Sequence, residues 1–249
     1  MKISIITITY NSSSTLAETI NSVINQSYKN IEYIIIDGGS SDNTIPIIKS
    51  YENKITTFIS EKDNGIYDAL NKGILLATGD VIGILHSDDF YTNTNVIQNV
   101  VNKLEQTNGD ALYADLFYVD KNNTSKIHRK WKSGNYSLEK FLYGWMPPHP
   151  TFFVKKTIYE KYGSFNLSLN SSADYELMLR FIYKEKIKVA YLPEFIIKMR
   201  LGGKSNVSLK NRIIANKEDR KAWRINNLKP YFFTLYIKPI RKIVQLFFI

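Results

Sequence analysis

The stretch KISIITITYNSSSTLAETINSVINQSYKNIEYIIID, residues 2–37, predicts a strand, a helix and a second strand in close succession. Residues 2–10 alternate in character and are rich in β-branched side chains, which favour strands. Residues 15–26 space their apolar side chains along one helical face, and residues 31–36 are nearly all apolar, as in a buried strand. Strands that alternate with helices over short connections indicate a parallel sheet with helices on both faces.

The same alternation continues along the chain. Further strands are expected at 56–60, 81–85, 111–120, 127–131 and 151–154, and further helices at about 45–48, 66–77, 96–104, 173–183 and 205–223. The predicted fold is therefore α/β, with a mainly parallel, Rossmann-like central sheet flanked by helices and with a helical C-terminal tail.

The composition excludes several kinds of site. The 249 residues are 44% hydrophobic, which is enough to build a large core. The chain has no cysteine, so disulfides, cysteine-based zinc sites and thiol nucleophiles are excluded. The segment after Met1 lacks the charged and then apolar pattern of a signal peptide, and the expected compartment is the cytosol.

The positive charge is concentrated at the C-terminal end. Residues 198–249 hold 13 lysines and arginines against 2 acidic residues, whereas the rest of the chain is nearly neutral. Residues 231–249 mix large apolar groups with bases, and Pro239 and the charges make a spanning helix unsuitable. Two alternatives remain for this segment: an interfacial segment on an anionic membrane surface, or a helix packed on the domain or on a homodimer partner. Nucleic acid is disfavoured as a partner because no recognised binding module is present.

Polar clusters follow four of the predicted strands. They are Thr9-Tyr10-Asn11, Asp37-Gly38-Gly39, Glu61-Lys62-Asp63 and His86-Ser87-Asp88-Asp89. In parallel α/β sheets ligands bind beyond the carboxyl ends of the strands. We therefore expect these clusters to meet at one edge of the sheet and to form a site.

Three carboxylate positions each admit two interpretations. Asp88 and Asp89 repel each other unless a cation lies between them, which suggests Mg²⁺ or Mn²⁺, but an aspartate pair can also begin a turn. Asp37 can bind a base or a ribose hydroxyl, or it can simply form the turn before two glycines. Asp174 opens a helix, where the helix dipole favours an acid, and it can also serve as a general base.

Other signatures are missing or ambiguous. No G-x-G-x-x-G follows the first strand, no G-x-S-x-G exists, and the Gly203-Lys204-Ser205 sequence lacks the leading glycine of a P-loop because residue 198 is lysine. Asp68 and Lys72, four residues apart, share a helix face. They form an exposed salt bridge, or Lys72 approaches a diphosphate.

Taken in order, these pieces resemble the family 2 glycosyltransferases, inverting enzymes of GT-A fold that use nucleotide sugars. The resemblance covers roughly residues 1–205. The matching segments are IITITYN (5–11), DGGSSDNT (37–44), EKDNGIYDALNKG (61–73), ATGD (77–80), LHSDD (85–89), HPTFF (149–153) and ADYEL (173–177).

The resemblance implies a role for each matching residue. The nucleotide-sugar donor would be bound by Thr9, Tyr10, Asn11, Asp37, Asp63, Asp68, Lys72 and Asp88. Asp89 would bind Mn²⁺ or Mg²⁺, Asp174 would be the catalytic base, and His149 would lie on the acceptor side. His86 departs from the Asp or Asn that often begins the metal motif. No Q-x-x-R-W follows the base, so single-sugar transfer is expected instead of processive polymerisation.

The implied activity is transfer of one sugar from a UDP-sugar to a polyprenyl-diphosphate-linked glycan, as in the synthesis of bacterial O-antigen, capsule or exopolysaccharide. The protein would act at the inner face of the plasma membrane. The expected domains are a GT-A catalytic domain at 1–205, with a donor half at 1–110 and an acceptor half at 111–205, and a basic aromatic extension at 206–249. A sugar nucleotidyltransferase is an alternative, but it would carry a glycine-rich basic loop after the first strand. A binding scaffold without a base is another, and Asp174 argues against it.

Overall fold

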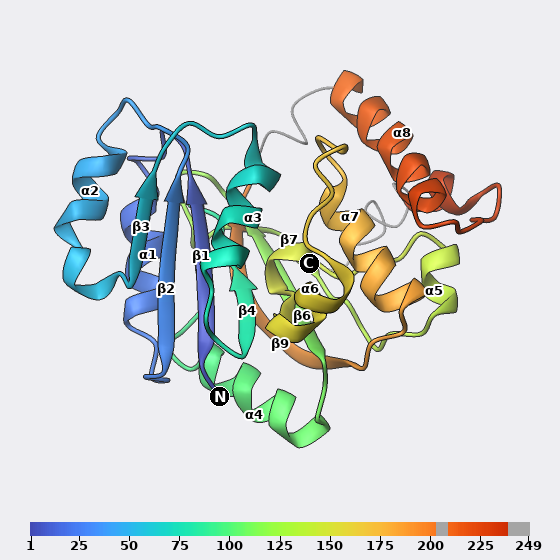
Figure 1. Cartoon of the computed structure of the whole chain (residues 1–249), viewed down its shortest axis with the longest axis horizontal. Helices are drawn as coiled ribbons and strands as arrows, with labels where there is room; N and C mark the ends of the chain where they lie inside the picture. Colours follow the sequence, from blue (N-terminus) through green and yellow to red (C-terminus); the bar gives the residue numbers. More distant parts are fainter. Residues whose placement is uncertain (203–208, 239–249) are drawn as a thin grey trace.

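The computed structural model describes residues 1–202 and 209–238, which form one mixed nine-stranded sheet with helices on both faces (Figure 1). The strands are β1 Ile3–Thr9, β2 Ile31–Asp37, β3 Thr57–Ser60, β4 Val81–Ile84, β5 Asp89–Tyr91, β6 Ala111–Val119, β7 Ile127–Trp131, β8 Phe153–Lys155 and β9 Val189–Arg200. The α-helices are α1 Leu16–Ile24, α2 Thr44–Ser50, α3 Ile66–Leu76, α4 Val96–Thr107, α5 Glu139–Leu142, α6 Lys156–Tyr162, α7 Ala173–Met178 and α8 Leu209–Ile225. Short 3₁₀ turns occupy Glu52–Lys54 and His149–Thr151, and a π-helical turn, Leu179–Lys184, extends α7.

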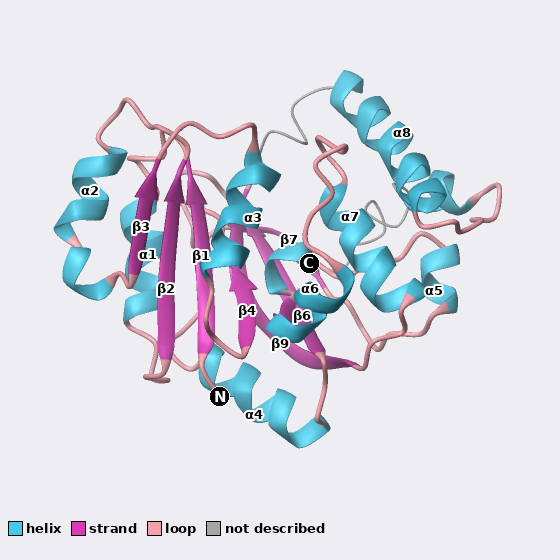
Figure 2. Cartoon of the chain, viewed as in Figure 1, coloured by secondary structure: helices cyan, strands magenta, loops and turns pink. Residues whose placement is uncertain are grey.

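The N-terminal half is parallel, as predicted. Its strand order is β3-β2-β1-β4, so the order reverses beside β1, where doubly wound folds bind ligands. Thr9 is paired with Asp37, and Asp37 with Ser60, so three strands end at the same level. Figure 2 shows the arrowheads of these three strands at one edge of the sheet.

The two faces of the sheet bury different side chains because alternate residues of a strand point to opposite faces. Ile6 and Ile8 of β1 join the cluster that contains Leu70 of α3. Ile3 and Ile5 join the cluster that contains Ile20 of α1 and the apolar side of α4. The unbroken apolar pattern of the predicted first strands thus reflects burial on both faces.

The C-terminal half of the sheet is mixed. β8 is antiparallel to β4 and β6, whereas β9 is parallel to β6 and antiparallel to β5. The strands expected at 111–120, 127–131 and 151–154 are confirmed, but β5 and β9 were not predicted. Pro193 and Glu194 interrupt the alternation in β9, and its pairing with β6 shifts register near Asp115.

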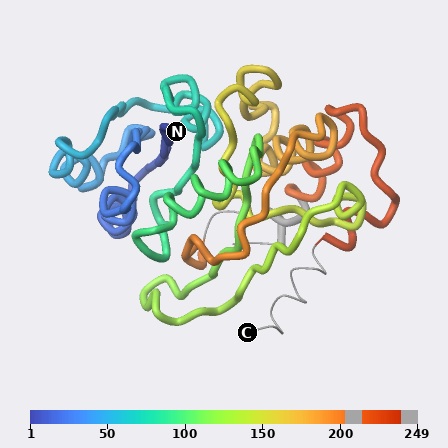
Figure 3. Tube along the Cα trace, turned by 90° about the horizontal axis from the view of Figure 1, so that it is seen from below, coloured from blue at the N-terminus to red at the C-terminus, as the bar shows by residue number. Residues whose placement is uncertain are grey.

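Helix α8 packs beside α7 and the chain then returns along the domain through residues 226–238 (Figure 1; Figure 3 shows the same segments, orange to red, lying together). Trp223 and Leu235 are buried. This part of the tail is therefore packed on the domain, while Tyr231, Phe232 and Tyr236 stay exposed. The predicted segments at 205–208 and 239–249 lie outside the described residues. Among the described residues, none of the helices combines the length and apolar character needed to cross a bilayer.

Candidate functional site

The ends of β1, β2 and β4 are joined by hydrogen bonds between the loops that follow them. The hydroxyl of Ser87 donates to that of Ser12 over 2.9 Å. The backbone N–H of Asn11 donates to the Ser40 hydroxyl over 2.8 Å, and the Asn11 side chain accepts from the backbone N–H of Ser41 over 2.9 Å. The predicted meeting of polar clusters at one edge is thus present.

Tyr10, Gly38 and Asp63 lie together at this edge. A Cβ on Gly38 would come within 2.5 Å of a carboxylate oxygen of Asp63 and 3.5 Å of the Tyr10 ring. A side chain at position 38 would therefore displace the Asp63 carboxylate. Tyr10 is 57% exposed, so its ring offers a flat surface to solvent, and the buried hydroxyl of Thr9 has no hydrogen-bond partner among the described residues.

Asp37 is fully buried and holds the turn that follows β2. Its carboxylate accepts from the backbone N–H groups of Gly39 and Ser40, at 3.1 and 2.9 Å, and from the hydroxyls of Ser40 and Ser60. This is the turn role that the sequence left open. Contact with a nucleotide would have to use what remains of its acceptor capacity.

Asp68 and Lys72 form the salt bridge that the sequence offered as one alternative. Nζ of Lys72 lies 2.7 Å from Glu61 and 3.6 Å from Asp68. The hydrogen bond that Lys72 donates to Glu61 raises the pKa of Lys72, and the charges of both acids raise it further although partial desolvation opposes them. In this state the cation of Lys72 is directed to Glu61.

Asp88 and Asp89 differ in their surroundings. Asp88 is partly exposed, whereas Asp89 is fully buried and neither of its carboxylate oxygens makes a well-formed hydrogen bond to a described residue. Burial raises the pKa of Asp89 well above its usual range, and the charge of Asp88 raises it further. The backbone N–H and the guanidinium of Arg200 lower this pKa only in part.

The Ser87–Asp89 segment is fixed from the sheet side. The guanidinium of Arg200 donates to the carbonyl of Asp88 over 2.6 Å and also pairs with Glu18 of α1. The hydroxyl of Thr19 lies 3.0 Å from the carbonyl of Ser87 and 2.8 Å from that of Asp89. Sequence reasoning missed Arg200 and Thr19, because neither stands near the motif along the chain.

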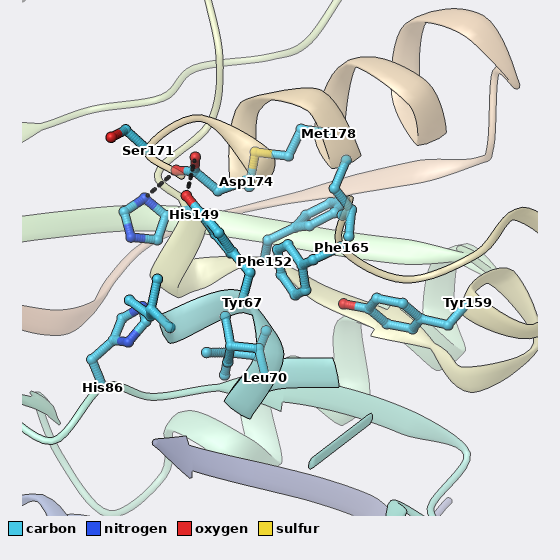
Figure 4. A pocket seen from close by; sticks show the side chains of 13 residues that line it. Tyr67, Leu70, His86, His149, Phe152, Tyr159, Phe165, Ser171, Asp174 and Met178 are labelled. Atoms are coloured by element: carbon cyan, nitrogen blue, oxygen red, sulfur yellow. Dashed lines mark hydrogen bonds and ion pairs between the residues drawn. The ribbon is translucent and has the colours of Figure 1, made fainter. Parts of the chain in front are cut away.

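Asp174 lies at a pocket of about 110 Å³ lined mostly by apolar side chains (Figure 4). The hydroxyl of Tyr67, on α3, donates to one carboxylate oxygen over 3.3 Å, and Nδ1 of His149 lies 3.2 Å from the other. Burial and the charge of Asp174 strongly raise the pKa of Tyr67, so this phenol stays protonated. Tyr67 belongs to a matching segment of the sequence, but nothing in the sequence indicated its partner.

His86 connects the two sides of the site. Its ring meets that of His149 edge to face, with 5.7 Å between ring centroids (Figure 4). Burial lowers the pKa of His86 to about 4 and His149 adds to the lowering, whereas Asp88 and Asp174 oppose it. His86 and Asp174 line the same pocket, and Asp88 follows His86 by two residues in the chain.

The described residues contain no group of three or more His, Cys, Asp or Glu side chains arranged to hold a metal ion. Asp88 and Asp89 are a pair, and Mg²⁺ and Mn²⁺ sites commonly add phosphate oxygens and water to one or two carboxylates. The unpartnered buried carboxylate of Asp89 fits such a cation, since a nearby positive charge would stabilise its ionised form.

Comparison with known proteins decides the family. The family model described as Glycosyl transferase family 2 matches residues 4–163. The chain belongs to this glycosyltransferase family. An uncharacterized glycosyltransferase of Mycobacterium tuberculosis is 34% identical over 180 residues, which cover 72% of this chain and 68% of that protein. A PGL/p-HBAD biosynthesis glycosyltransferase of Mycobacterium bovis is 26% identical over 208 residues, which cover 82% of this chain and 78% of that protein.

Solved structures show that this glycosyltransferase has the GT-A fold. S. aureus TarS, residues 1–349 in complex with UDP-GlcNAc, superposes with a TM-score of 0.72 and 18% identity over 91% of this chain and 65% of that one. The mannosyltransferase PcManGT from Pyrobaculum calidifontis, in complex with GDP-Man and Mn²⁺, superposes with a TM-score of 0.67 and 17% identity. The match covers 95% of this chain and 68% of that one. The chain therefore spans slightly less than two thirds of the TarS fragment.

The predicted site residues of the glycosyltransferase fall into two groups. One lies at the strand ends and contains Thr9, Tyr10, Asn11, Asp37, Asp63, Asp88 and Asp89. The other lies at the pocket and contains His149 and Asp174. Asp68 and Lys72, on α3, form an ion pair, and Lys72 also pairs with Glu61.

Proposed function

We propose that this glycosyltransferase transfers a single sugar from a UDP-sugar to an acceptor hydroxyl, with inversion and with the aid of a divalent cation. The observation that carries the proposal is the position of Asp174. Asp174 and His86 line the same pocket, and His86 is two residues before Asp88 in the chain. This supports a base close to a donor-binding edge.

The chemistry is one displacement. Asp174 takes the proton from the acceptor hydroxyl while that oxygen forms a bond to the anomeric carbon. The bond from this carbon to the diphosphate oxygen breaks on the opposite face, and the nucleoside diphosphate leaves with the electron pair. An α-linked donor would give a β-glycoside. Tyr67 and His149 orient the carboxylate, one at each oxygen.

The donor would lie across the strand ends. We assign its nucleoside end to Thr9, Tyr10, Asn11, Asp37 and Asp63. The diphosphate end would approach Asp68 and Lys72 once the Lys72–Glu61 pair opens. The TarS complex holds UDP-GlcNAc and the PcManGT complex holds GDP-Man, so similarity supports a nucleotide sugar, and uridine is our proposal.

Asp88 and Asp89 would hold Mn²⁺ or Mg²⁺. When bound, the cation would supply positive charge that stabilises the diphosphate leaving group. Asp88 contributes the accessible carboxylate of the pair and Asp89 the buried one. Arg200 and Thr19 keep the segment in place by holding its backbone carbonyls.

We propose a polyprenyl-diphosphate-linked glycan as the acceptor, in the synthesis of a bacterial surface polysaccharide at the inner face of the plasma membrane. Arg220 and Arg224 of α8 line a groove with Tyr231 and Phe232, which are exposed. Bases beside exposed aromatic rings suit the headgroup region of an anionic membrane. Residues 1–110 would form the donor half, 111–205 the acceptor half and 206–249 the membrane-facing extension. A homodimer that covers the same surface is the competing possibility.

The deciding experiment measures UDP release from a panel of UDP-sugars, with Mn²⁺ or EDTA, and with lipid extracts as acceptors. Asp174→Asn should bind UDP normally, but its rate of UDP release from the UDP-sugar should fall about 100-fold or more. Asp89→Ala should weaken Mn²⁺-dependent UDP binding. A binding scaffold would bind UDP but would not form UDP from any UDP-sugar. A nucleotidyltransferase would instead exchange pyrophosphate. Full activity of Asp174→Asn would refute the proposed base.

A further inference from the structure

Glu218, on α8, binds the loop that leads to Asp174. Its carboxylate accepts hydrogen bonds from the backbone N–H groups of Asn170, Ser171 and Ser172, at distances between 2.7 and 3.1 Å. Hydrogen bonds to an ionised carboxylate are stronger than bonds between neutral groups. We infer that Glu218 is a positioning residue that fixes Asp174 for proton transfer, an inference that rests on the proposed role of Asp174 as the base.

Trp223 of α8, and Asn226 directly after the helix, bind the two residues that follow Asp174. The indole N–H of Trp223 donates to the hydroxyl of Tyr175, and the side-chain amide of Asn226 donates to Glu176, both over 2.9 Å. All four side chains are buried. Asp174 is therefore flanked on both sides along the chain by residues that are bonded to α8.

Helix α7 has no side-chain cap of its own. Ser172 precedes it, but the Ser172 hydroxyl donates to the carbonyl of Ala215 on α8 over 3.2 Å and makes no cap hydrogen bond. The N–H groups of residues 170–172 and the Ser172 hydroxyl therefore all donate to α8. Ser171, whose N–H binds Glu218, lines the pocket beside Asp174, so the fixed loop is also part of the pocket wall.

The position of the Asp174 carboxylate is thus set from two directions. Tyr67 and His149 hold its two oxygens, while α8 holds the backbone before it through Glu218 and the Tyr175 side chain after it through Trp223. A misplacement of about 1 Å at a reacting group can cost about 100-fold in rate. Loss of the Glu218 carboxylate would release three successive N–H groups and let the loop move.

The test compares Glu218→Ala and Glu218→Gln with Glu105→Gln, a charge-matched change at an exposed position of α4. Donor sites are counted by titration with UDP and Mn²⁺. Turnover is UDP release per titrated site, with UDP-GlcNAc or whichever UDP-sugar the wild type cleaves fastest. We expect turnover to fall about 10- to 100-fold for Glu218→Ala, and less for Glu218→Gln, which keeps one acceptor oxygen. The UDP affinity of both Glu218 variants should stay within about twofold of the wild type. The turnover of Glu105→Gln should also stay within about twofold.

A second readout needs no substrate. Hydrogen exchange of the amides of residues 170–172 should be faster in Glu218→Ala than in the wild type. A lower melting temperature with unchanged turnover per titrated site would overturn the inference, since Glu218 would then be only structural. If the alanine variant does not fold, Glu218→Gln decides by the same criterion. An inactive Asp174→Asn beside a fully active Glu218 variant refutes this inference alone, whereas an active Asp174→Asn refutes the proposed function.

Discussion

Nδ1 of His149 lies 3.2 Å from one carboxylate oxygen of Asp174, and the Tyr67 hydroxyl reaches the other oxygen. His149 comes from the 3₁₀ turn before β8, Tyr67 from α3 and Asp174 from α7. Three distant parts of the chain thus meet at one carboxylate. An acid held in this way has a fixed direction for proton transfer, which is what a general base requires.

Replacing either partner of Asp174 should slow the reaction less than replacing Asp174. We expect His149→Gln and Tyr67→Phe each to lower turnover about 10-fold, because one orienting hydrogen bond remains. UDP affinity should not change. His128→Gln is the matched control, since His128 forms a similar pair with Asp120 on the β6–β7 hairpin. Equal turnover in His149→Gln and His128→Gln would show that His149 does not orient the base.

The outer surface of the C-terminal segment should bind anionic vesicles. Phe232 is 87% exposed, and Arg220 lies over the ring of exposed Tyr236, with 5.4 Å to its centroid. Phe232→Ser should reduce flotation with phosphatidylglycerol vesicles several-fold and leave the melting temperature nearly unchanged, because the side chain is mostly exposed and its ring meets that of Phe233 edge to face. Leu75→Ser, at an 83% exposed position of α3, is the control. The idea fails if both variants float as the wild type does, or if phosphatidylcholine vesicles bind equally well.

Glu32 should make the protein sensitive to acid. Burial raises the pKa of this carboxyl, but hydrogen bonds from Lys2, Ser4 and Thr78 outweigh it and lower the pKa from 4.5 to about 2. The folded state therefore holds the proton less tightly than the unfolded state. The resulting stabilisation is complete above about pH 5 and is lost as the pH falls toward 2.

Glu32→Gln should lower the free energy of unfolding by about 2 kcal/mol at pH 7, a figure reduced because the Lys2 partner is partly exposed. The difference from the wild type should shrink between pH 5 and pH 2. Urea titrations across this range measure both quantities. A constant difference at all pH values would mean that the charge of Glu32 is not responsible.

Gly79 should tolerate no side chain. A Cβ at this position would lie 2.6 Å from the Ser4 hydroxyl, 2.8 Å from the Ser4 backbone nitrogen and 2.9 Å from the Lys2 carbonyl oxygen. Backbone atoms cannot move aside as a side chain does, so Gly79→Ala should cost about 2 kcal/mol or more of stability. At Gly109 the atoms nearest to an added Cβ would be 3.2 Å away. Gly109→Ala should therefore lower the melting temperature less than Gly79→Ala does. Equal melting temperatures would contradict the structure.

The parallel half of the fold was predictable because its signals are local. The apolar runs of β1 and β2 and the helical spacing of α1 sit next to one another in the sequence, and short connections allow few other arrangements. The gathering of Thr9, Asp37 and Ser87 followed from the rule that parallel strands end at one edge. The roles proposed for the individual donor-side residues came from the resemblance to the family and not from this rule.

What the sequence could not show depends on contacts between distant elements. Pro193 and Glu194 hide β9, and the strand forms because β6 and β5 supply partners on both of its sides. Glu218 lies in a polar helix with no motif, and its contact with the loop of Asp174 exists only after α8 has packed. The pairing of Lys72 with Glu61 was likewise not predictable, because the loop after β3 brings Glu61 close to Lys72 only in the folded protein.

The pairing of β5 with β9 bears on how such enzymes can diversify. β5 carries Asp89 and lies at the edge of the sheet, where it pairs with β9, a strand that comes much later in the chain. A chimera that joined the first half of this chain to the second half of a relative would have to preserve that pairing. Otherwise the unpaired backbone N–H and C=O groups of a strand edge would be exposed. The first and second parts of the chain therefore have to match each other where β5 meets β9.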